Sequence, residues 1–204
     1  MNDLHKALGD ISSIRRQMAR ATEFRGYGPV TLAATGLFAI LAASAQSLWF
    51  PAPAQHTSAY LSIWVSTAVL SSGLIAVHTR TRAHRIHSGL ADEMIHMAIE
   101  QFLPAVAAGA LLTIAIARFV PGSLWMLPGL WQVIFSLGVF SSCRFLPQPI
   151  IWAGAWYLVT GLTCIALAGD RALSPWAMGV PFGAGQLLVA AILFVTSRET
   201  SDER

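Results

Sequence analysis

The chain has 204 residues and a net charge of +3, and 55% of its residues are apolar while only 11% are charged. Its mean hydropathy of +0.59 is too high for a soluble domain of ordinary composition. The composition therefore predicts an all-α integral membrane protein. We do not expect nucleic-acid binding, because membrane topology explains the positions of the basic residues.

Six apolar segments, each near the roughly 20 residues that cross a bilayer as a helix, predict six transmembrane helices arranged as three hairpins. Five are expected over residues 30–50, 59–77, 124–142, 150–168 and 176–195, and the third is the apolar part of a longer helix over 88–120. We expect residues 78–87 to form a loop. The bundle, residues 29–196, is preceded by a cytoplasmic segment, 1–28, and followed by a cytoplasmic tail, 197–204.

The first predicted element is an amphipathic helix over residues 3–25. Its apolar side chains recur at spacings of three and four and form a narrow stripe on an otherwise charged helix. The candidate partner-binding residues of this stripe are Leu4, Ile11, Ile14 and Met18. The stripe predicts a dimerisation or partner-docking helix, or one that lies on the anionic leaflet. The alternative is a lead-in helix packed beneath its own bundle.

Small side chains recur in patterns that let helix backbones approach closely in lipid. The first span has such a ridge at every fourth position: Thr31, Thr35, Ala39, Ala43 and Ser47. The third span has a second ridge: Gln101, Ala105, Gly109, Thr113 and Ala117. Gly179 and Gly183 form a GxxxG pair in the sixth span. We expect all three to be packing surfaces.

The helix expected over 88–120 joins a charged segment to the third span. It would measure about 50 Å, so its first turns must lie in the headgroup region or the cytoplasm. Glu100 lies at this junction, and Pro104 removes the backbone hydrogen bond that the Glu100 carbonyl would accept. Within the hydrocarbon, Glu100 would need a partner and would indicate a proton relay or substrate contact. At the membrane surface it would simply be solvated.

Other polar groups fall inside the spans. Gln132 and Gln186 come at comparable depths, and amides near mid-membrane are expected to face the interior, either each other or a cavity. With Glu100 and His96 they are the candidate ligand or pathway residues. The second span carries several hydroxyl groups for which we expect interhelical hydrogen bonds, with a polar pathway as the alternative. They belong to Ser62, Ser66, Thr67, Ser71 and Ser72.

The basic residues predict the orientation. Of the 13 lysines and arginines, only Arg118 and Arg171 lie outside when both termini are placed in the cytoplasm. This orientation puts several aromatic residues near the outer interface, where aromatic belts are found. They are Trp49, Tyr60, Trp64, Trp125 and Trp176.

Histidines and carboxylates cluster before the third span. Glu93 and His96 have the i, i+3 spacing of carboxylate-bridged di-iron bundles, and His84 and His87 lie nearby. Such a site needs a second motif on another helix, and no other span has a carboxylate. Haem ligation by His78 and His96 is a further alternative. The remaining interpretation is that these groups bond to loops and headgroups, so we predict no cofactor, with a metal or haem as the alternative.

No pattern predicts a catalytic residue. The chain has no GxSxG, phosphate-binding loop or HExxH motif. Cys143 and Cys164 are expected towards opposite faces of the membrane and therefore as free thiols.

Three segments carry a resemblance that covers most of the chain: ISSIRRQMARATEFRGYGP before the first span, LWMLPGLWQVIFSLGVFSS in the fourth, and VPFGAGQLLVAAILF in the last. With these segments the chain resembles a group of small six-span bacterial inner-membrane proteins of unassigned function. The resemblance implies a location in the bacterial inner membrane and no catalytic residue.

These observations favour a non-enzymatic membrane sensor or interaction protein. Its bundle would oligomerise or hold a lipid-like ligand, and the N-terminal helix would report to a cytoplasmic partner. The first alternative is a small-molecule transporter or channel subunit that uses the polar residues of the spans. The second is a metal-containing or haem-containing redox protein.

Overall fold

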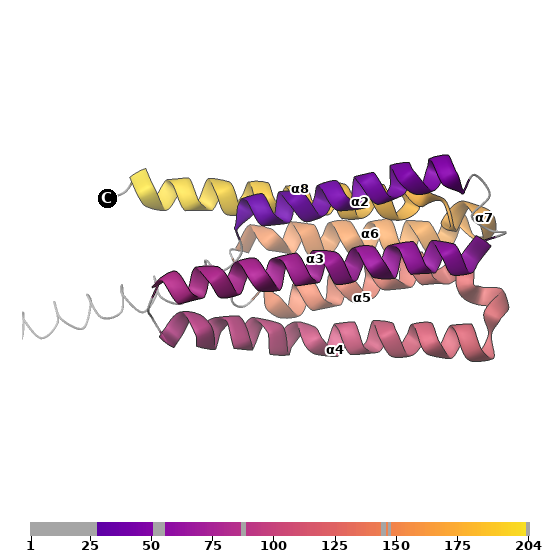
Figure 1. Ribbon diagram of the computed structural model, residues 1–204, viewed down its shortest axis with the longest axis horizontal. Helices are drawn as coiled ribbons and strands as arrows, with labels where there is room; N and C mark the ends of the chain where they lie inside the picture. Colours follow the sequence, from indigo (N-terminus) through magenta and orange to yellow (C-terminus); the bar gives the residue numbers. More distant parts are fainter. Residues whose placement is uncertain (1–27, 51–55, 87–88, 144–145, 147, 203–204) are drawn as a thin grey trace, which may run out of the picture.

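The structure is a computed structural model that describes residues 28–50, 56–86, 89–143, 146 and 148–202. Side chains are described for these residues except 82–99, 170 and 197–202. The described residues form helices and no strand, and the helices run side by side along one long axis (Figure 1). The predicted all-α, six-helix membrane fold is confirmed.

Six helices are long and apolar enough to cross a membrane, with apolar stretches of 20 to 25 residues. They are α2 (Pro29–Trp49), α3 (Thr57–Ile86), α4 (Gly89–Phe119), α5 (Leu127–Ser142), α6 (Ile151–Leu167) and α8 (Pro175–Asp202). The short elements between them are η2 (Pro121–Met126), η3 (Gln148–Ile150) and α7 (Gly169–Ala172). The apolar stretches of α5 and α6 begin in η2 and η3, respectively.

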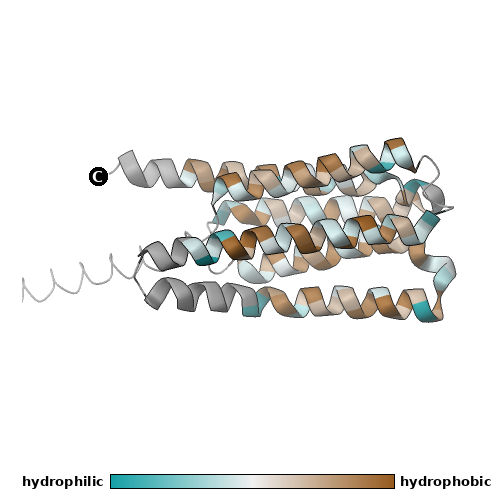
Figure 2. Ribbon diagram, viewed as in Figure 1, coloured by the Kyte–Doolittle hydropathy of each residue, from teal (hydrophilic) through white to brown (hydrophobic). Residues whose placement is uncertain are grey.

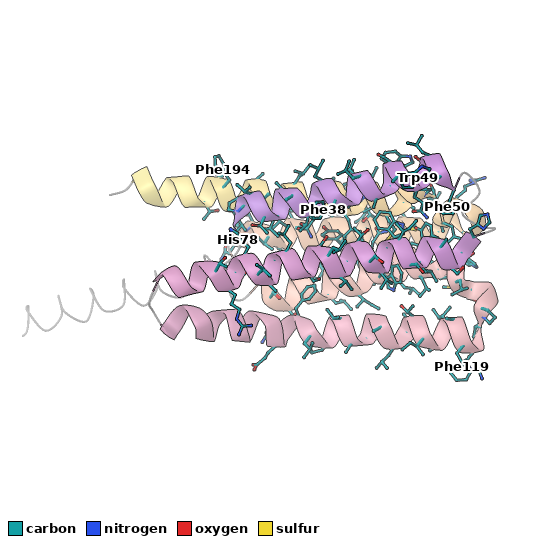
Figure 3. All side chains as sticks on the ribbon, in the orientation of Figure 1. Phe38, Trp49, Phe50, His78, Phe119 and Phe194 are labelled. Atoms are coloured by element: carbon teal, nitrogen blue, oxygen red, sulfur yellow. The ribbon has the colours of Figure 1, made fainter. Side chains whose placement is uncertain are left out.

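The bundle has two distinguishable ends. His78 and Phe194 lie towards one end, which we call the terminal end because α2 begins and α8 ends there (Figure 3). Trp49, Phe50 and Phe119 lie towards the other, which we call the loop end. Apolar residues cover all six long helices between the two ends (Figure 2). This distribution is the one that a lipid-facing bundle requires.

The first and last helices, α2 and α8, pack together most extensively. A Cβ atom added to Gly179 would clash with the Cβ of Ala43, and one added to Gly183 would clash with the side chain of Ile40. A Cβ added to Gly36 would lie 3.0 Å from the Gly183 carbonyl oxygen. The GxxxG pair is therefore a packing surface, as predicted. The predicted ridge of α2 faces the same contact, with its first four residues buried and its last half-buried.

A second close contact joins α5 and α6. A Cβ added to Gly129 would lie 2.7 Å from the Gly161 carbonyl oxygen, and one added to Gly161 would lie 2.8 Å from the Gly129 carbonyl oxygen. The hairpin partners α2 and α3, α4 and α5, and α6 and α8 also pack together. The three predicted hairpins are present, but the tightest contacts lie between hairpins rather than within them.

The helices α3 and α4 lie at the edge of the bundle. Only 11% of the apolar stretch of α3 is buried, and none of that of α4. The second predicted ridge does face a neighbour, because Trp131 Nε1 of α5 donates a hydrogen bond of 2.8 Å to Thr113 Oγ1. Ile134 of α5 lies against Gly109. The outer surfaces of both helices are open to lipid.

Two expectations about α3 are wrong. Residues 78–86, expected as a loop, continue the helix, so that α3 has 30 residues and measures about 45 Å. The reason is that no glycine or proline occurs between Gly73 and Gly89 to end it. The hydroxyls of Ser62 and Thr67 also do not bond between helices. Each donates a 2.8 Å hydrogen bond to a carbonyl one turn earlier in α3.

Candidate functional site

Glu100 lies at the start of the apolar stretch of α4, and its side chain is exposed on the outside of the bundle. The exposed side chain has no neighbour among the described residues inside the bundle to act as a partner, and its depth in the membrane stays a prediction. Pro104 has no backbone N–H, so the Glu100 carbonyl in the preceding turn of α4 lacks its helical donor. Ser141 Oγ of α5 donates a 3.2 Å hydrogen bond to the Gln101 carbonyl in this turn. Glu100 does not line the interior.

Several predicted site residues lie outside the described part of the chain. They are Leu4, Ile11, Ile14, Met18 and His87, together with the side chains of His84, Glu93 and His96. Their proposed roles stay predictions. Among the described residues there is no group of three histidine, cysteine, aspartate or glutamate side chains that could hold a metal ion.

His78, the other candidate haem ligand, is half-buried at the terminal end. A Cβ added to Gly28, at the start of α2, would lie 2.6 Å from its Cε1 atom. Its Nδ1 atom is buried and has no hydrogen-bond partner within the described residues. The imidazole is thus held against the first turn of α2 rather than directed into the centre of the bundle.

Gln132 is fully buried in α5, as predicted, but its partner is not Gln186. Its Nε2 atom donates a 2.9 Å hydrogen bond to the Ala177 carbonyl of α8 and also contacts Met178 Sδ at 3.8 Å. Ala177 precedes Pro181 by four residues, so its carbonyl lacks the helical N–H donor that a residue other than proline would supply. The side-chain amide of Gln132 replaces this missing donor.

Gln186 is half-buried elsewhere on α8, where it packs beside Gly36 of α2. It lies nine residues beyond Ala177, which corresponds to about 13 Å along the helix. The expectation that the two glutamines face each other is therefore wrong. Similar depths in two spans do not bring two side chains together, because depth does not determine which side of a helix a residue occupies.

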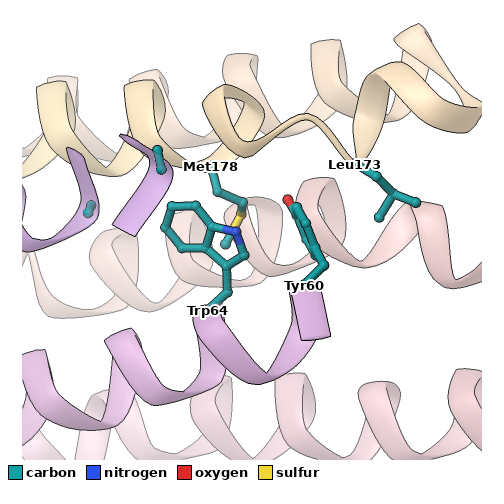
Figure 4. Close-up of a cluster of buried hydrophobic side chains, with 6 residues drawn as sticks. Tyr60, Trp64, Leu173 and Met178 are labelled. Atoms are coloured by element: carbon teal, nitrogen blue, oxygen red, sulfur yellow. The ribbon is translucent and has the colours of Figure 1, made fainter. Parts of the chain in front are cut away.

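Trp64 and Tyr60 of α3, expected near the outer interface, face the interior of the bundle near its loop end, where they share the neighbour Met178 with Gln132. Only 3% of Trp64 and 1% of Tyr60 are exposed, and both pack in one cluster with Met178. Figure 4 shows the Trp64 indole nitrogen beside the Met178 side chain and the Tyr60 hydroxyl directed towards the segment that carries Leu173 and Met178. Neither polar atom has a hydrogen-bond partner in the described residues.

Gln46 of α2 adds a further buried amide. It lies on the same helical face as Ala39 and Ala43, which belong to the cluster, and only 1% of it is exposed. Neither its Nε2 nor its Oε1 atom has a partner among the described residues, and the same is true of Gln132 Oε1. We call these side chains the loop-end polar cluster. It consists of Gln46, Tyr60, Trp64, Gln132 and Met178.

An aromatic layer lies next to this cluster. Phe135 of α5 is in edge-to-face contact with Phe102 of α4, Tyr157 of α6 and Phe182 of α8, at centroid distances of 5.2, 4.8 and 5.4 Å. Such contacts stabilise by about 0.5–1.5 kcal/mol each beyond their burial. Phe135 follows Gln132 by about one turn, so the layer lies between the cluster and the terminal end.

Several other buried hydroxyl groups bond within their own helices, whereas those of Thr79 and Tyr157 have no partner among the described residues. Thr35 donates to the Leu32 carbonyl at 2.8 Å, and Ser136 donates to the Val133 carbonyl at 2.6 Å. At the terminal end, Ser142 donates to the Gly138 carbonyl at 2.9 Å. These groups do not extend the loop-end polar cluster through the aromatic layer.

Sequence reasoning missed Gln46 and did not predict that Tyr60 and Trp64 face the interior of the bundle. The signal for Gln46 was present, since it continues the spacing of Ala39 and Ala43 along the packed face of α2. The two aromatic residues carried no such signal, because an aromatic near a span end is equally consistent with a belt and with a core position. Their placement depends on how α3 is rotated.

No family model, no curated protein and no solved structure matches the chain.

Proposed function

We propose that this protein is a non-enzymatic membrane sensor or interaction protein. The bundle serves as a scaffold, and the N-terminal helix over residues 3–25 binds a cytoplasmic partner. The observation that supports this most is the aromatic layer around Phe135, because it interrupts the polar groups of the core. A protein that binds and reports does not need a continuous polar lane, whereas a transporter does.

The proposed location is the bacterial inner membrane, with both termini in the cytoplasm. The charges of the described residues support this orientation. Arg118 lies in the last turn of α4 and Arg171 in α7, both at the loop end. Four arginines lie in the helical segments at the terminal end, namely Arg80, Arg82 and Arg85 of α3 and Arg198 of α8. The excess of basic residues would then face the cytoplasm. The open surfaces of α3 and α4 are available for lipid and for self-association.

The test is capture of partners from native membranes by the full-length protein and by a variant that lacks residues 2–24. The deletion should abolish capture while the bundle stays folded, as judged by gel filtration. Ile14→Glu, on the apolar stripe, should act like the deletion, and Ser13→Glu, on the opposite face, should not. Unchanged capture by the deletion variant would refute the proposal.

A second candidate function is a small-molecule transporter or channel subunit, and the loop-end polar cluster favours it. Buried polar atoms without partners are costly in a membrane and often mark solute pathways. This function predicts solute flux in proteoliposomes that falls in Gln132→Leu. Glu100→Gln would leave the flux unchanged if Glu100 stays outside the pathway. Absence of flux for ions, sugars and amino acids would count against this function.

A further inference from the structure

We infer that the loop-end polar cluster is an internal binding site for water. Its atoms that lack partners include the indole N–H of Trp64, the carbonyl oxygen of Gln132, the Tyr60 hydroxyl and the whole amide of Gln46. All four residues are at least 97% buried. In an apolar interior each such group would carry most of its desolvation penalty unless a partner is supplied.

The hydrogen-bonding capacities of these groups are complementary to water. Both hydrogens of the Gln132 amide are directed to Ala177 O and Met178 Sδ, so Oε1 can only accept. The Trp64 indole can only donate. Gln132 and Trp64 share the neighbour Met178. A water molecule that bonds to both would accept from Trp64 and donate to Gln132, and its second hydrogen would remain available to the Tyr60 oxygen. One molecule thus satisfies groups from α3 and α5.

The surroundings favour a small neutral molecule. No member of the cluster is charged, and the side chains packed around it include Ala39, Ala43 and Phe182. The site lies close to the loop end, because Tyr60 is three residues, or about 5 Å, from the first residue of α3. On the opposite side the aromatic layer separates it from the terminal end. The cluster therefore lies nearer to one face of the membrane than to the other.

The experiment uses the full-length protein, labelled with ¹⁵N, in lipid nanodiscs. Magnetisation transfer from water to indole protons is measured by NMR, with the Trp64 signal assigned from Trp64→Phe. The matched control is Trp156, whose Nε1 donates to the Pro181 carbonyl at 2.9 Å. Strong transfer to Trp64 and little to Trp156 is the expected result. Transfer to Trp64 no greater than that to Trp156 would overturn the proposal.

A second measurement does not depend on that assignment. If water binds the Tyr60 hydroxyl, Tyr60→Phe removes a hydrogen bond and lowers the thermal midpoint by about 2–4 °C. Tyr157→Phe is the control, because its hydroxyl is also buried without a described partner but lies against Gly185 beside the aromatic layer. That variant should leave the midpoint unchanged or raise it. A thermal midpoint that rises in Tyr60→Phe would show that no water binds the Tyr60 hydroxyl and would contradict the proposal.

Discussion

At the scale of single residues, the main feature is that a side chain of α5 supplies the donor that a proline removes from another helix. Gln132 bonds to the carbonyl that Pro181 leaves free in α8. Ser141 donates to the Gln101 carbonyl of α4, which is next to the Glu100 carbonyl that Pro104 leaves free. Both prolines lie inside helices, and in a membrane the freed carbonyls need such replacement partners. The glutamine in mid-membrane therefore has a structural role, whatever else it binds.

Replacing Gln132 by leucine should destabilise the bundle by about 1–3 kcal/mol, because the buried Ala177 carbonyl loses its donor. Pro181→Ala restores a backbone N–H, so the double variant should recover part of this loss. Gln186→Leu is the control, with an expected change within about 0.5 kcal/mol. The free energy of unfolding of the wild-type protein and the three variants is measured in a denaturing detergent. Equal losses in the single and double variants would contradict this role of Gln132.

The two cysteines should differ in reactivity. Both are free, as predicted; Cys143 caps the end of α5 and is half-buried, whereas Cys164 is buried in α6. Burial raises the pKa of the Cys143 thiol above its ordinary value, so less thiolate is present at a given pH. Its alkylation by iodoacetamide should therefore continue to accelerate above the pH at which a free cysteine levels off. Mass spectrometry from pH 7 to 10 measures this, and a profile identical to that of free cysteine would contradict it.

At the scale of the helices, glycines decide which pairs come close. The α5–α6 contact depends on Gly129 and Gly161, where the obstacle to a side chain is a backbone carbonyl that cannot rotate away. Gly73, in contrast, has open space around it on the lipid-facing part of α3. The same chemical change at the two positions should therefore have opposite effects.

Gly129→Ala should destabilise the protein by about 1–3 kcal/mol, because α5 and α6 must separate to admit a methyl group. Gly73→Ala should stabilise it by about 0.5–1 kcal/mol, because alanine has the higher helix propensity and meets no neighbour. The midpoints of thermal unfolding of the two variants and the wild-type protein are compared in detergent. Similar effects of the two substitutions would show that the α5–α6 contact is looser than described.

The helices themselves could largely be predicted from the sequence, because length and hydropathy determine a membrane span. The small-residue ridge of α2 and the Gly179–Gly183 pair could also be predicted as packing surfaces. The ends of α3 could not, since a polar run after a span is compatible with both a loop and a continued helix. The loop-end polar cluster was beyond prediction for another reason. It depends on the rotation of α3 and on which hairpins meet, and neither leaves a periodic pattern in one chain.

At the scale of the whole molecule, the charge distribution predicts a cytoplasmic terminal end. In a background with both native cysteines replaced by serine, Gly122→Cys lies in the exposed turn at the loop end, and Thr81→Cys is exposed towards the terminal end. A membrane-impermeant maleimide added to intact cells should label the first and not the second. Labelling of Thr81→Cys alone would show that the terminal end faces the outside, which is the opposite orientation.

The central claim is that the core is closed at the aromatic layer and that the protein binds and reports rather than conducts. The most direct measurement is solute release from liposomes that contain the purified protein. We expect release of glycerol, urea and ions at the rate of protein-free liposomes, and a faster rate in Phe135→Ala, which opens the layer. Release by the wild-type protein above the protein-free rate, and lowered by Gln132→Leu, would contradict the account and identify the core as a pathway.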